Sequence, residues 1–119
     1  MRVRTFKPQF APLVKSGAKR QTIRPMPKRL PRAGDKESWR EWSGLPYRSP
    51  QREPATVQLI SVDCIWISYG FIIVKDRALS PRAAKSLARR DGFADLLPML
   101  DWFKSTHGLP FTGILIRAK

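Results

Sequence analysis

The distribution of proline constrains the fold of this chain more than any other feature of its sequence. Six of the 11 prolines lie in one quarter of the chain, at Pro25, Pro27, Pro31, Pro46, Pro50 and Pro54. Because proline cannot continue a helix beyond its first turn, this segment cannot form long helices. We expect a long basic loop region over residues 25–54, with a turn at Gly34–Asp35 and one strand after it. Loops of this length in compact domains are typically functional or disordered.

Regular patterns on either side of this region predict an α+β domain. Two-residue alternation predicts strands over residues 2–6, 20–25, 36–42, 55–62, 65–74 and 111–117. Helical spacing predicts a helix over 8–16 that ends before Gly17, and two more helices that begin at Ser80–Pro81 and at Asp95. Since strands and helices do not alternate regularly, we expect one domain over residues 1–119, a small β-barrel of five to six strands with helices packed at its rim.

Positive charge is concentrated in a third of the chain that overlaps this proline-rich segment. The net charge is +14, from 23 Lys and Arg against 9 Asp and Glu. Residues 15–52 hold 11 of the basic and 3 of the acidic residues, so +8 of the +14 lies there. A basic surface attracts polyanions at long range and raises the rate of encounter with them. General solubility is the alternative explanation, but the clustering favours nucleic acid, and RNA in particular, as the partner.

Composition also sets limits on site and location. With one cysteine and one histidine, the chain has no internal disulfide and no cluster of metal ligands, so we expect neither a metal nor another cofactor. Cys64 is expected to be a small buried hydrophobe. The most apolar run, residues 64–74, is about half the length of a membrane-spanning helix. We therefore expect no membrane partner, a cytoplasmic location and a monomer.

The densest group of polar side chains lies in residues 16–25, Ser-Gly-Ala-Lys-Arg-Gln-Thr-Ile-Arg-Pro. If the segment is extended from Arg20 onward, Arg20, Thr22 and Arg24 share one face and Ile23 lies on the other. The polar face then looks into a cleft or into solvent. The alternative is a charged edge strand, where basic residues discourage strand-to-strand aggregation.

The spacing Gly17-x-Lys19-x-x-Thr22-Ile23-Arg24 resembles the signature of the ASCH family, small relatives of PUA-type RNA-binding domains. Further matches follow in the order of that family, at Gly34–Asp35, Asp91–Gly92–Phe93, Trp102–Phe103 and residues 107–111. The resemblance covers nearly the whole chain and implies a PUA-like β-barrel.

The first functional hypothesis is the binding of RNA, another nucleic acid or a modified nucleoside in a basic cleft. Lys19, Thr22, Arg24 and Asp91 would line this cleft. Aromatic and basic side chains suit base stacking and phosphate contact, and they would extend the binding surface at Arg20, Arg40, Trp42, Tyr47 and Arg48. The alternative for Trp42 and Tyr47 is that they anchor the loop to the body of the domain.

The second hypothesis is an amidohydrolase. Some ASCH members resemble enzymes that remove the acetyl group from N4-acetylcytidine with a K-x-x-T pair and a glutamate. The resemblance places Lys19 and Thr22 in the pair, and Asp91, one methylene shorter, in the position of the glutamate. Thr22 would be the nucleophile and Lys19, if neutral, its base, with Asp91 orienting Lys19.

The third hypothesis is a ribonuclease, for which the sequence offers no distinctive pair of acid and base. We assign His107, in the last helical turn before Gly108, to a structural role as a helix cap. Trp102 and Phe103 are likewise expected to be helix surface and core.

Overall fold

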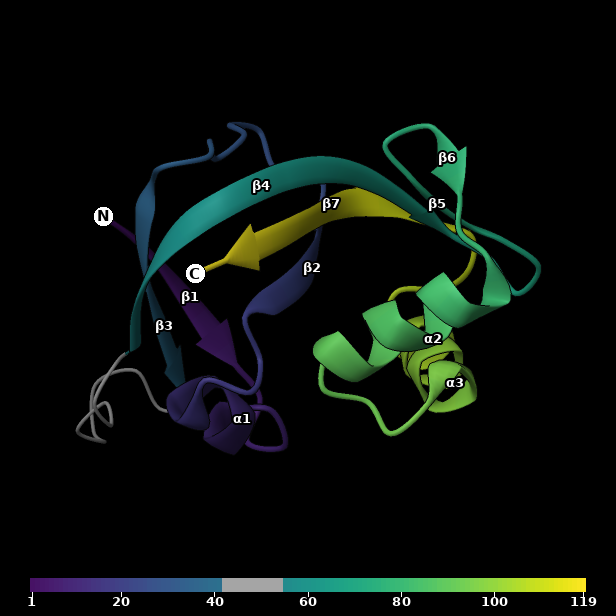
Figure 1. Ribbon diagram of the computed structural model, residues 1–119, viewed down its shortest axis with the longest axis horizontal. Coiled ribbons are helices and arrows are strands. Elements are labelled where there is room, and N and C mark those ends of the chain that lie inside the picture. The colour runs from purple at the N-terminus through teal and green to yellow at the C-terminus, as the bar shows by residue number, and fades with distance from the viewer. Residues whose placement is uncertain (42–54) are drawn as a thin grey trace.

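The computed structural model describes residues 1–41 and 55–119, and in these residues seven strands form one sheet with three helices against it (Figure 1). The elements are β1 (Arg2–Phe6), α1 (Ala11–Ser16), β2 (Gln21–Pro25), β3 (Lys36–Glu41), β4 (Ala55–Ile67), β5 (Ile72–Val74), β6 (Arg77–Ala78), α2 (Pro81–Arg90), α3 (Leu96–Thr106) and β7 (Phe111–Ala118). Figure 1 shows α2 and α3 together below one end of β4 and α1 below its other end. The α+β class expected from the sequence is confirmed.

The long strand β4 organises the sheet. Its first residues pair antiparallel with β3, which in turn pairs parallel with β1. The rest of β4 pairs antiparallel with β7 and with β5, and β2 adds to the far edge of β7. Figure 1 shows β4 arching over β7 and β2, so the sheet is curled. Among the described strands, however, no backbone ladder joins β1 to β2, and the sheet remains open between them.

Strand β7 separates the core into two parts, because successive side chains of a strand point to opposite faces. Leu115 and Phe111 pack with α2, α3 and the end of β4 around Met99 and Phe103. Ile114 and Ile116 face the other way, in a second cluster that includes Phe6, Phe10, Val14, Trp39 and Val57. The two faces of β7 thus supply two apolar clusters, one under α2 and α3 and one beside α1.

Gly113 allows β2 to lie close against β7. A Cβ atom at this position would be 2.2 Å from the carbonyl oxygen of Arg24 and 2.7 Å from the ring of Phe111. Both distances are far below van der Waals contact, so only glycine fits without moving β2. Since Gly113 pairs with Pro25 and its neighbour Ile114 with Arg24, this close approach fixes the position of the Arg24 backbone.

Several local predictions are confirmed. Gly17 ends α1 with a φ of 86°, in the left-handed region. Ser80 caps α2 by accepting a hydrogen bond at Oγ from the backbone N–H of Ala83, and Asp95 caps α3 by accepting one from Leu96. Strand β3 occupies the predicted position within the described residues.

The predicted break between two strands at residues 63–64 is wrong. Strand β4 continues through it, because residues 61–67 pair without interruption with β7, and the chain turns only at residues 68–71. The burial predicted for Cys64 is wrong for a related reason. Ile65 and Ile67 point into the core, so the two-residue period turns Cys64 to the exposed face.

Candidate functional site

A cavity of about 320 Å³ lies where the two apolar clusters meet. Its walls come from the end of β1, from β2, from the end of α2 and from α3. The polar lining consists of Thr5, Lys7, Lys19, Thr22, Arg24, Asp91, Thr106 and His107, and the apolar lining of Phe6, Phe10, Ile23, Pro25, Trp102 and Phe103. The cavity therefore combines aromatic walls with a small number of buried charged groups.

Lys19 reaches the cavity from the turn that joins α1 to β2. The turn is fixed by Gly17 and by a hydrogen bond of 2.9 Å from the Lys19 N–H to the carbonyl of Leu13. The side chain is only 3% exposed, and its Nζ lies 3.3 Å from Asp91 Oδ1. Lys19 Nζ also donates to the backbone carbonyl of Asp91. Because this residue precedes β2, it can share a cavity with Thr22 in spite of the three-residue spacing.

Asp91 is the residue that follows α2, and it is 5% exposed. Besides Lys19, its Oδ1 accepts a hydrogen bond of 3.1 Å from Gln21 Nε2. The same amide nitrogen donates to the carbonyl of Leu87, also at 3.1 Å. Gln21, the first residue of β2, thereby fixes the end of α2 against the sheet.

Burial dominates the electrostatics of the Lys19–Asp91 pair. Desolvation lowers the pKa of Lys19 from its ordinary 10.5, and Arg24 lowers it further, while the charge of Asp91 acts in the opposite direction. Desolvation likewise raises the pKa of Asp91 from its ordinary 3.8, against the effect of Lys19 and of the hydrogen bond from Gln21. Both groups are thus held closer to their neutral forms than they would be in water.

Arg24 and Thr22 form the polar wall on the β2 side. Arg24 Nε donates to Thr22 Oγ1 at 3.0 Å, and one Nη2 hydrogen bond of 2.9 Å reaches the carbonyl of Thr5 in β1. The guanidinium lies 4.8 Å from the centre of the Phe6 ring. Burial and the nearby charge of Arg4 lower the pKa of Arg24 to about 10, so it stays a cation at neutral pH.

The opposite wall is aromatic and belongs to α3. The Trp102 ring packs edge to face against Phe10 at 5.9 Å and lies 5.8 Å from His107. Lys7 Nζ lies 5.3 Å from the centre of the Trp102 ring. Desolvation and the charges of Lys7 and Arg24 lower the pKa of His107 from 6.5, so it is neutral at pH 7.

The structure brings together four of the residues singled out in the sequence. Lys19, Thr22, Arg24 and Asp91 all line the cavity, and Thr22 and Arg24 share a face of β2 as predicted. The chemical roles assigned to Lys19, Thr22 and Asp91 stay predictions, since co-location alone does not demonstrate them.

Arg20 and Arg40, two of the other predicted binding residues, do not line the cavity. Arg20 donates to the carbonyl of Val14 at 2.9 Å and so completes the end of α1. Arg40 lies in β3, where its Nε donates to Ser38 Oγ at 2.9 Å. Trp42, Tyr47 and Arg48 fall outside the described residues. A binding role for these five residues stays a prediction.

Sequence reasoning missed the part that the aromatic wall plays in the cavity. His107 is the C-cap residue of α3 and Phe103 lies in the core, as expected, but these two residues and Trp102 also line the cavity. The five-residue spacing of Trp102 and His107 does not indicate a shared surface, because residues on one helix face are three or four residues apart. Nor does it indicate that β1 and β2 lie opposite these residues.

Comparisons with protein-family models, curated proteins and solved structures gave no match to this chain. Within residues 1–41 and 55–119, no group of three or more His, Cys, Asp and Glu side chains is placed to hold a metal ion. None of the helices in these residues has the length and apolar character needed to cross a membrane.

The Lys19–Asp91 pair predicts a specific dependence of stability on pH. Because the pKa of Asp91 is raised in the folded protein, its contribution to stability is largest below pH 3.8 and falls as the pH rises through the raised value. Because the pKa of Lys19 is lowered, its contribution rises between the lowered value and pH 10.5. Each change amounts to about 1.4 kcal/mol per pH unit within its window.

Urea unfolding between about pH 3 and about pH 11 measures this effect as the difference in free energy of unfolding between wild type and Lys19→Met/Asp91→Leu. We expect the difference to pass through a minimum between the two windows. The control is Lys85→Met, which removes a half-exposed partner of Asp95 and should give a flat difference. A flat profile for the buried pair would contradict the assignment.

Proposed function

We propose that the cavity binds the base of a nucleoside or of a nucleotide in single-stranded RNA. The observation that carries the proposal is the combination of an aromatic wall at Trp102 with a buried donor and acceptor at Lys19 and Asp91 in one cavity. Its volume of about 320 Å³ is at the lower end of the range for small-molecule sites.

Stacking and edge recognition are the two interactions that a base requires. Aromatic side chains stack on the face of any unpaired base. The Lys19 ammonium donates hydrogen bonds, and the Asp91 carboxylate accepts them. The edge of a base carries both acceptors and donors, which can pair with these two groups. Arg24, with an N–H fork beside Thr22, can bond a carbonyl of the base or an oxygen of the ribose.

The charge of the chain and its resemblance to the ASCH family support the same function. A net charge of +14 attracts nucleic acid at long range. The curled sheet, open between β1 and β2, is compatible with a PUA-like barrel that side chains rather than a ladder complete at this point. The proposal thus assigns the chain to the ASCH group of PUA-like domains, as a binding protein.

Loss of the aromatic wall tests this function. Trp102→Leu should weaken binding by about 1–3 kcal/mol per stacked base, measured by calorimetric titration with ribonucleosides, including N4-acetylcytidine, and by fluorescence anisotropy with single-stranded RNA. Arg24→Gln should also weaken binding. Arg82→Gln is the control of matched charge, since Arg82 is exposed at the opposite end of α2. Equal affinity in Trp102→Leu and wild type would contradict the proposal.

Hydrolysis of an acylated base is a second candidate function, favoured by the position of Thr22. Its Oγ1 accepts a hydrogen bond from Arg24, which stabilises a developing negative charge on that oxygen. Lys19, whose pKa is lowered, lies in the same cavity as a candidate base. Thr22 Oγ1 would attack the amide carbonyl, the amine of cytidine would leave with a proton, and water would release the acyl group as acid.

Incubation with N4-acetylcytidine tests this second candidate, with cytidine and acetate followed by chromatography. The candidate predicts release by wild type, none by Thr22→Ala, and partial recovery in Thr22→Ser, which restores the hydroxyl. Absence of release from wild type at high protein concentration would exclude this reaction and leave the binding function intact.

A further inference from the structure

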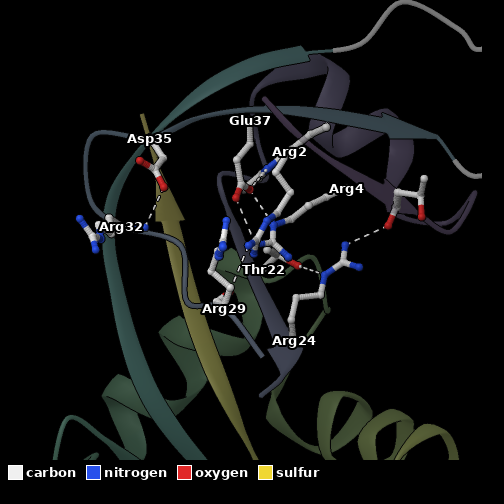
Figure 2. Close-up of polar contacts among 10 residues, drawn as sticks. Arg2, Arg4, Thr22, Arg24, Arg29, Arg32, Asp35 and Glu37 are labelled. Atoms are coloured by element: carbon white, nitrogen blue, oxygen red, sulfur yellow. Dashed lines mark hydrogen bonds and ion pairs between the residues drawn. The ribbon is translucent and has the colours of Figure 1, made fainter. Parts of the chain in front are cut away.

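A cluster of arginines lies beside the cavity, at the open edge between β1 and β2. Arg2 and Arg4 project from the same face of β1 as Phe6, which lines the cavity, because they are four and two residues away from it. Figure 2 shows the side chains of Arg2, Arg4, Arg24 and Arg29 pointing toward the region around Glu37 and Thr22. We call Arg2, Arg4, Arg24 and Arg29 the arginine cluster.

Within the described residues, the ion pair of this cluster joins Arg4 to Glu37. Arg4 Nε lies 2.6 Å from Glu37 Oε1, and Arg4 Nη2 donates to Oε2 at 3.1 Å. The same Oε1 accepts a hydrogen bond of 3.0 Å from Trp39 Nε1. Since Glu37 is 1% exposed and engaged on both oxygens, it neutralises one of four cations.

Two of the other three arginines, Arg2 and Arg24, donate to neutral groups. An Nη2 hydrogen bond of 3.1 Å links Arg2 to the carbonyl of Arg29, and Arg24 donates to a hydroxyl and to the carbonyl of Thr5. Two of the five N–H groups of Arg24 are used in this way within the described residues. Guanidinium groups with remaining donors at one edge form a fork suited to phosphate oxygens.

We propose that the arginine cluster binds the phosphate of the nucleotide whose base occupies the cavity. The inference rests on the proposed function and narrows it from nucleosides in general to phosphorylated ligands. Arg24 and Thr5 border both the cavity and the cluster, so one ligand can reach both. Arg4, held by Glu37 and 9% exposed, is a positioning residue, and Arg2, Arg24 and Arg29 make the contacts.

Protection of the sheet edge is the competing explanation, because basic residues on edge strands prevent aggregation. Protection requires charges that face solvent along the edge. Arg4 instead has a side chain that is only 9% exposed. Burial lowers the pKa of Arg24 and the charge of Arg4 lowers it further, while Asp91 and Glu37 act in the opposite direction. Crowded like charges are unfavourable unless an anion neutralises them, so the arrangement favours a ligand site.

The test compares a nucleoside with its own phosphates. Calorimetric titrations use the tightest-binding ribonucleoside of the series and its 5′- and 3′-monophosphates, with wild type and with Arg2→Gln/Arg29→Gln. Neither of these residues lines the cavity. The control, Arg82→Gln/Arg89→Gln on the exposed face of α2, lowers the net charge by the same two units.

We expect one monophosphate to bind wild type and the control at least about tenfold more tightly than the nucleoside, as charge-assisted hydrogen bonds imply. The Arg2→Gln/Arg29→Gln variant should lose this gain and keep its affinity for the nucleoside. A wild type that binds nucleoside and monophosphates equally would overturn the phosphate site while the base pocket stands.

Two further probes separate the remaining outcomes. If no nucleoside binds, the proposed function fails. Broadening of the inorganic phosphate signal in ³¹P NMR then shows whether the arginine cluster binds an anion by itself. Broadening lost in Arg2→Gln/Arg29→Gln supports an anion site, and absence of broadening in wild type overturns it. An RNA of about 12 nucleotides without terminal phosphates shows whether the cluster binds a phosphodiester or a terminal phosphate. The affinity of this RNA depends on Arg2 and Arg29 only if the cluster binds phosphodiesters.

Discussion

The buried pair of Lys19 and Asp91 is the interaction on which the rest of the site depends. It joins the turn before β2 to the end of α2, two segments 72 residues apart in the sequence. Gln21 reinforces the connection by donating to both Asp91 and Leu87. A buried ion pair is costly to desolvate, and its net contribution to stability is small. The ion pair instead fixes positions, since it holds β2 and the helices at the separation that leaves a cavity between them.

Apolar packing supplies the stability that this polar connection does not. The two clusters on either side of β7 include the largest fully buried side chains of the described residues, among them Trp39, Phe103 and Met99. The cavity lies at their boundary, so its aromatic walls are also parts of the two cores. Base recognition at the aromatic wall and phosphate recognition at the arginine cluster would then use adjacent surfaces, with Arg24 common to both.

The parts of this structure that were predictable from sequence depend on neighbouring residues. Gly17, Ser80 and Asp95 indicate helix ends through local chemistry, and the structure confirms them. The continuous β4 and the exposure of Cys64 depend instead on pairing with β7, which comes some 50 residues later in the chain. Two-residue alternation could not reveal that pairing.

The candidate site divides in the same way. The motif Lys19-x-x-Thr22 and the resemblance at Asp91 indicate three cavity residues from the order of amino acids alone. Trp102 and His107 are not indicated, because an aromatic residue on a helix is typical of core packing and their position opposite β2 depends on the tertiary fold. The arginine cluster is equally hidden, since Arg2 and Arg29 come together across 27 residues of chain.

The measurement that tests the central claim most directly is titration of ¹⁵N-labelled protein with a ribonucleoside, observed at the tryptophan indole N–H signals. Trp102→Phe identifies the signal of Trp102, and Trp66 in β4, which does not line the cavity, serves as the reference. The account predicts a saturable shift of the Trp102 signal while that of Trp66 stays in place. A Trp102 signal that does not move when nucleosides or RNA bind would contradict it, because the ligand would then lie outside the cavity.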